Sequence, residues 1–144
     1  MAFVFAAFFA TAASATDTSD NAADDLIRAA GNSDLSEFVW KKRPLVVFAD
    51  SENDPAFIEQ MALIESRPEA LIERDVVVLT DTDPAARSPA RLKLRPRGFM
   101  LAILSKEGRV QLRKPFPWDV REITRSIDKL PIRQRELREE KSGN

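Results

Sequence analysis

The chain holds 144 residues, with 22 Lys and Arg against 23 Asp and Glu for a formal charge of -1, and 44% of its residues are hydrophobic. That length fits one domain with a sizeable core, and the balanced charge argues against a general polyanion or nucleic-acid binder. Cys and His both number 0, which excludes disulfide oxidoreductases, Cys–His and Ser–His nucleophiles, and zinc sites built from Cys and His. Acid–base chemistry would have to use carboxylates, Lys, Ser or Thr.

The amino-terminal segment has the pattern of an export signal. An apolar run from Ala2 to Ala10 precedes Ala13-Ser14-Ala15, the small-x-small form that signal peptidase recognises. We therefore predict a signal peptide over residues 1–15 and a periplasmic or secreted mature protein. No Lys or Arg precedes Arg28, so the usual basic start is missing. A membrane anchor is the alternative, but about a dozen apolar residues are too few to span a bilayer as a helix.

Between residues 16 and 32 the chain is rich in Ala, Asp, Ser, Thr and Asn, which predicts a flexible linker. The string SDLSEFVW then offers Ser33 or Asp34 as a helix cap, with Leu35 and Phe38 on one side of a short helical turn. We therefore expect the folded domain to cover residues 33–138, followed by a tail at 139–144.

A strand, a helix and a second strand follow. The consecutive apolar residues from Leu45 to Phe48 are typical of a strand covered on both faces. Asp54-Pro55 predicts a helix start, because Asp accepts free amide protons and Pro fits the first helical position. That helix ends near Arg67-Pro68, and a second buried strand covers Arg74 to Thr80. This order predicts a βαβ unit with two parallel strands.

The second half of the chain predicts a loop, a hairpin and a helix. Residues 81–98 contain three prolines and five basic residues and predict a long irregular loop. Strands over 99–104 and 109–113 then form a hairpin, in which Gly108 supplies the positive φ of the turn. Apolar residues at helical spacing predict a helix over WDVREITRSIDKL, with one face on the sheet. After Pro131, the charged segment RQRELREEKSGN predicts a short exposed helix that frays.

A βαβ unit, a hairpin and a helix in this order predict an α/β, thioredoxin-like fold: a mixed central sheet flanked by helices. The strings FVWKKRPLVVFADSEND, ERDVVVLTD, GFMLAILSKEGRVQLR and IDKLPIRQRELR resemble an uncharacterised family of secreted thioredoxin-like domains (domain of unknown function 4174), known from bacteria and some animal extracellular-matrix proteins. The resemblance covers Leu35 to Arg138 and implies fold and export, with no established reaction. Against thioredoxin itself, the acidic turn Asp50–Asp54 replaces the redox pair and Arg97-Gly98 replaces the catalytic cis-proline, so we predict a redox-inactive domain.

Carboxylates form the first candidate site. Asp50, Glu52 and Asp54 follow one parallel strand, and Asp81 and Asp83 follow the next, at the edge where α/β sheets bind ligands. If these acids converge, Asp50, Glu52 and Asp81 are candidate ligands for Ca²⁺ or Mg²⁺. The calcium-loop pattern lacks its Gly and its bidentate Glu, however. We favour the interpretation that the acids cap the helix and stay solvated, and we predict no metal, no cofactor and no catalytic residue.

Basic residues form the second candidate site. An anionic glycan, a phosphate or an acidic partner could be bound through bidentate Arg contacts by Lys41, Arg43, Arg91, Arg95 and Arg97. The alternative is a solvated loop balanced by the acidic amino-terminal tail. Trp40 and Trp118 could form a partner-binding pair, but Trp residues more often close the ends of a small core, which is the interpretation we prefer.

Together these features predict an exported binding or interaction module for an unknown protein or anionic glycan. We expect a monomer or weak dimer, with no nucleic-acid ligand and no stable membrane insertion. Two alternatives remain: an enzyme that uses the carboxylate edge with a divalent cation, and a subunit of an envelope or extracellular assembly that pairs through a sheet edge.

Overall fold

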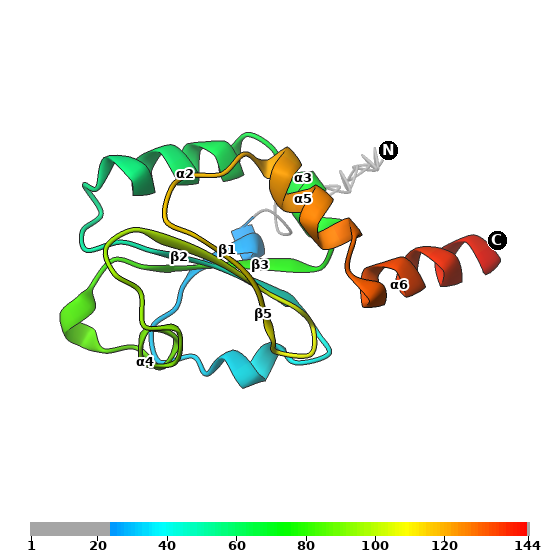
Figure 1. The fold of residues 1–144 in the computed structure, drawn as a ribbon, viewed down its shortest axis with the longest axis horizontal. Helices are drawn as coiled ribbons and strands as arrows, with labels where there is room; N and C mark the ends of the chain where they lie inside the picture. The colour runs from blue at the N-terminus through cyan, green and yellow to red at the C-terminus, as the bar shows by residue number, and fades with distance from the viewer. Residues whose placement is uncertain (1–23, 144) are drawn as a thin grey trace, which may run out of the picture.

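The computed structural model describes residues 24–143 (Figure 1). Its centre is a mixed sheet with the strand order β1-β3-β2-β4-β5, in which β2 pairs with β3 in parallel and with β4 antiparallel. The predicted βαβ unit and hairpin are therefore confirmed. The strands are β1 (Ile27–Ala29), β2 (Arg43–Phe48), β3 (Val76–Asp81), β4 (Met100–Leu104) and β5 (Val110–Lys114). The helices are η1 (Leu35–Phe38), α2 (Pro55–Glu65), α3 (Pro68–Ile72), η2 (Pro84–Ala86), α4 (Pro89–Leu94), α5 (Val120–Asp128) and α6 (Pro131–Ser142).

Helices cover both faces of the sheet, with α2, α3 and α5 on one face and η1 and α4 on the other (Figure 1). Every residue of β2 is buried, as the consecutive apolar run predicted. Because side chains alternate along a strand, Leu45 and Val47 join the core beneath α2 and α5, whereas Val46 and Phe48 join the core beneath α4.

Capping side chains start the helices that flank the sheet. Asp54 Oδ1 accepts a hydrogen bond from the amide of Ala56 at 2.8 Å, with Pro55 as the first residue of α2. Asp119 caps α5 in the same way, and the hairpin glycine, Gly108, has a φ of 82°. These predicted signals are confirmed, because each acts within a few residues of chain.

Two segments predicted as irregular are ordered. Part of the predicted linker forms β1, which pairs in parallel with Val78–Thr80, and Leu26 beside it is 3% exposed. Within the predicted loop 81–98, Pro84 and Pro89 stand at the starts of η2 and α4, where Pro is tolerated because the missing amide has no helical partner. The predicted signal peptide lies outside the described residues.

The carboxyl-terminal helix is longer and better anchored than predicted. α6 runs past residue 138, where we placed the end of the domain, and its far end extends away from the rest of the fold (Figure 1). Arg133 in its first turn is 2% exposed. Among residues 24–143, none of the helices combines the length and apolar character needed to cross a membrane.

Candidate functional site

The carboxyl ends of β2 and β3 meet at one edge of the sheet, where ligands of α/β proteins commonly bind. Asp50 and Glu52 are exposed in the turn after β2, while Asp54 is occupied as the cap of α2. The turn therefore keeps the geometry of a strand-to-helix connection and presents two solvated carboxylates.

The carboxylate of Asp81 is buried and fully engaged. Arg91 Nη2 donates to Asp81 Oδ1 at 2.9 Å and to the carbonyl oxygen of Ala49 at 3.1 Å, and the Ser88 hydroxyl donates to Asp81 Oδ2. Burial by itself raises the pKa of Asp81, but hydrogen bonds from Arg91 and Ser88 outweigh it and hold the pKa below its usual value. Asp81 thus joins the ends of β2 and β3 to α4.

The predicted convergence of acidic residues occurs only in part. Glu52, Asp81 and Asp83 border one hollow of about 280 Å³, but no group of three carboxylates among residues 24–143 could hold a metal ion. Arg91 already occupies the space around Asp81 that a cation would need. Of the three candidate ligands, Glu52 and Asp81 border this hollow and Asp50 does not.

The five predicted basic contacts lie in different places. Arg43 and Arg91 are 1% and 9% exposed and bind internal partners. Lys41 precedes β2 at its amino end. Arg95 and Arg97 precede β4, whose first residue pairs with Phe48 at the other end of β2. One continuous contact by all five is therefore ruled out by the register, and only the three exposed side chains stay a prediction.

Exposed side chains on α4 and next to its ends form a group that we call the α4 face. Its apolar member, Leu92, is 59% exposed. Its cations make no ion pair with any residue in the range 24–143, and they are Arg87, Lys93, Arg95 and Arg97. Two of them have left-handed backbone conformations, with φ of 47° at Arg87 and 50° at Arg95. Such conformations cost about 1 kcal/mol or more outside Gly, and they often mark functional sites.

An ion-pair network at the amino end of β2 was not anticipated from the sequence. Arg43 donates to Glu136 at 3.0 Å, and Lys106 donates to Glu136 at 2.8 Å and to Asp75 at 2.7 Å. Burial by itself raises the pKa of Glu136, but hydrogen bonds from Lys106 and Arg43 lower it to about 2. Arg43 and Glu136 are 93 positions apart, so no local pattern could have indicated the pair.

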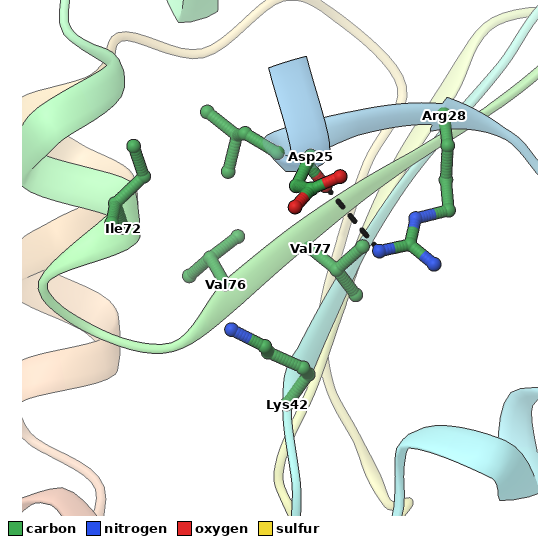
Figure 2. A pocket seen from close by; sticks show the side chains of 7 residues that line it. Asp25, Arg28, Lys42, Ile72, Val76 and Val77 are labelled. Atoms are coloured by element: carbon green, nitrogen blue, oxygen red, sulfur yellow. Dashed lines mark hydrogen bonds between the residues drawn. The ribbon is translucent and has the colours of Figure 1, made fainter. Parts of the chain in front are cut away.

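Two hollows flank this network, and adjacent residues of the chain border them. Figure 2 shows Lys42 and Arg28 at the rim of a hollow of about 250 Å³, beside Ile72 and Val76. Arg28 donates to the carbonyl oxygen of Asp25 at 3.4 Å there. Arg43 borders the other hollow, which measures about 320 Å³ and lies beside the β4–β5 turn.

The two tryptophans have different environments. Trp118 packs on the core, and its main-chain N–H and C=O are both bound by the buried amide of Gln60, at 2.8 and 3.0 Å. Trp40 is 66% exposed with a φ of 64°, so the prediction that it closes the core is wrong. Its main-chain amide donates to the carbonyl oxygen of Lys106 at 2.7 Å.

A family model described as Domain of unknown function (DUF4174) matches residues 34–136, most of the chain. The chain belongs to the DUF4174 family. The matched range includes both the α4 face and the network around Glu136. No curated protein matches this DUF4174 chain.

Solved structures that resemble the DUF4174 chain include peroxiredoxins. Plasmodium vivax 2-Cys peroxiredoxin in its reduced form is 16% identical with a TM-score of 0.56, over 72% of this chain and 84% of that chain. Plasmodium yoelii Prx1a modified at the N-terminus is 18% identical with a TM-score of 0.53, over 70% and 80%. Plasmodium yoelii thioredoxin peroxidase I is 18% identical with a TM-score of 0.52, over 70% and 79%. Because these identities are only 16–18%, they show a shared thioredoxin-type fold alone. This chain has 0 Cys.

Proposed function

We propose that this DUF4174 chain is an exported, redox-inactive module that binds an acidic protein partner through the α4 face. The observation that carries the proposal is an exposed leucine, Leu92, in the same segment as four exposed cations that make no ion pair with residues 24–143. An apolar anchor with a charged rim is typical of protein interfaces. Arginine adds bidentate recognition of carboxylates.

The inner side of α4 keeps this surface rigid. Ala90 and Leu94 are 0% and 2% exposed in the core, and Arg91 is held by Asp81 and the carbonyl oxygen of Ala49. A helix fixed in this way presents its outer side chains at low entropic cost on binding. The buried cluster around Asp81 therefore holds α4 in place behind its exposed side chains.

The test compares two charge-matched double variants. We expect the double variant Arg95→Gln, Arg97→Gln to bind the acidic protein partner, once it is captured on the unmodified chain, about tenfold or more weakly. Arg121→Gln with Arg125→Gln, two exposed cations of α5 on the opposite face of the sheet, is expected to leave binding within about twofold. Equal losses in both would contradict the proposal. Retention on heparin that depends on Arg95 and Arg97, without any protein partner, would instead identify an anionic glycan.

Thermal unfolding with added cations tests the alternative function, a cation-dependent enzyme. We expect millimolar Ca²⁺, Mg²⁺ or Mn²⁺ to leave the Tm unchanged within about 1 °C, because no group of three carboxylates among residues 24–143 could hold such a cation in the native state. A rise that Asp50→Asn abolishes would favour the enzyme and count against the binding module.

Export is supported by the apolar segment and the small-x-small pattern at Ala13-Ser14-Ala15. The intact mass of the exported protein tests this part of the proposal. A mass that corresponds to loss of residues 1–15 is expected, and retention of those residues in the mature protein would contradict it.

A further inference from the structure

The hollow beside the β4–β5 turn has two chemically different walls. It measures about 320 Å³ and lies between that turn and the junction of α5 with α6. The polar wall contains Ser105, Lys106, Arg109 and Gln111, and the apolar wall contains Leu130, Pro131 and Ile132. The register of β4 places it at the opposite end of the sheet from Arg95 and Arg97, so it is separate from the α4 face.

Two basic residues that line this hollow have a hydrogen-bond donor without a partner in the part of the chain that the structure describes. Lys106 Nζ can donate three hydrogen bonds and donates two, to Asp75 and Glu136. Arg43, which also lines the hollow, is 1% exposed, and its Nε finds no hydrogen-bond partner among residues 24–143. A buried donor without an acceptor is uncommon and costly. The third proton of Lys106 Nζ therefore favours a ligand that supplies an acceptor.

Positive charge prevails in the lining. Arg43, Lys106 and Arg109 border the hollow together with one carboxylate, that of Glu107. The Arg109 side chain is 77% exposed, and its Nε lies 3.6 Å from Glu107 Oε2, which is too long for a hydrogen bond. Its guanidinium group is therefore available to a ligand at the mouth.

Two of the basic residues that line the hollow, Arg43 and Lys106, already bind a carboxylate within the protein. Glu136 Oε1 reaches both Arg43 Nη2 and Lys106 Nζ from the side of α6, at 3.0 and 2.8 Å. Lys106 thus holds two internal carboxylates, those of Asp75 and Glu136, and also borders the hollow. Its third proton and the guanidinium group of Arg109 suit a ligand carboxylate better than a neutral group.

We propose that this hollow binds a small organic acid, with its carboxylate on Lys106 and Arg109 and its apolar body against Leu130 and Ile132. The volume equals that of about ten water molecules at about 30 Å³ each, which leaves room for a small organic acid. The apolar wall favours such a ligand over inorganic phosphate or sulfate, which would leave that wall facing water.

The test is an NMR titration of the ¹⁵N-labelled chain with 3-phenylpropanoate and, as the matched neutral compound, 3-phenylpropanamide. We expect the acid to bind with a Kd on the order of 1 mM, with amide shifts at residues 105–111 and 130–132. The amide compound is expected to bind at least about tenfold more weakly. Equal binding of the two, shifts confined to other residues, or no saturation by about 10 mM would overturn the proposal.

Two arginine variants separate the site from general charge. We expect Arg109→Gln to weaken binding of the acid by about tenfold and Arg125→Gln to change it by less than twofold. Arg125 is a close match, because it is 70% exposed and lies 3.4 Å from Glu122, much as Arg109 lies beside Glu107. Equal effects of the two variants would contradict a specific site.

A second titration, with peptides, tests whether the bound carboxylate belongs to a chain terminus or to a free acid. Acetyl-Ala-Phe with a free carboxyl end is compared with the same peptide amidated at that end. Binding of the free peptide about tenfold tighter than 3-phenylpropanoate would assign the ligand to a chain terminus, and weaker binding would assign it to a free acid. Equal binding of the free and amidated peptides, together with equal binding of the small acid and its amide, would show that the carboxylate does not contribute to binding and would contradict the proposal.

Discussion

The substitution Glu136→Gln tests how α6 is attached to the fold. Glu136 is the carboxylate shared by Arg43 and Lys106, and Arg43 is 1% exposed. A glutamine keeps the size of the side chain and removes its charge. The buried guanidinium group then loses its carboxylate while it remains desolvated, which is the costly way to break an ion pair.

The size of the effect follows from the pKa of Glu136. Burial acts to raise it, but the hydrogen bonds from Lys106 and Arg43 dominate and lower it from 4.5 to about 2. That difference corresponds to at most about 3 kcal/mol of stability at neutral pH. Because the Glu136 side chain is 21% exposed, solvent screens part of it, and we expect a loss of about 2 kcal/mol. The Tm should fall by about 6 °C.

Urea unfolding of the unmodified protein and of the Glu136→Gln variant, at pH 7 and at pH 3, measures this loss. The folded-state pKa is depressed, so the contribution is complete above about pH 4.5 and disappears as the pH falls towards 2. The advantage of the unmodified chain should therefore shrink by more than half at pH 3. Glu139→Gln, an exposed carboxylate of the same helix, is the control. An effect of Glu136→Gln equal to that of Glu139→Gln, or a loss independent of pH, would refute the reasoning.

Three further substitutions test other parts of the fold by urea unfolding. Asp81→Asn should cost about 2–3 kcal/mol because Arg91 stays buried without its counter-charge, whereas exposed Asp50→Asn should cost less than about 0.5 kcal/mol; similar losses would contradict this. Gln60→Leu should cost about 2 kcal/mol, since it leaves the main-chain N–H and C=O of Trp118 unpaired; an unchanged midpoint would show that water replaces the amide. Arg95→Gly should stabilise the fold by up to about 1 kcal/mol by relieving its left-handed backbone, while it weakens partner binding; a loss of stability would show that the side chain supports the fold.

Signals carried by a few consecutive residues were sufficient for much of the fold. The apolar run of β2 predicted a strand buried on both faces, and Asp54-Pro55 predicted the start of α2. Gly108 predicted the hairpin turn. Each depends on local backbone conformation or on side-chain alternation, which a short stretch determines before distant contacts form. The absence of thiol chemistry needed only the count of 0 Cys.

Tertiary structure decided which charged residues are available to a partner. Lys41 and Arg43 look alike in the string WKKRP, yet Lys41 is exposed and Arg43 is buried against Glu136, 93 positions away. β1 likewise has a linker-like sequence and becomes a strand only because β3 offers it an edge. Such pairings depend on groups that are distant in sequence and near in space, and the free energy of a charge depends on those neighbours. Composition and periodicity determined the fold class of this protein, and only the assembled sheet determined which of its cations can bind a ligand.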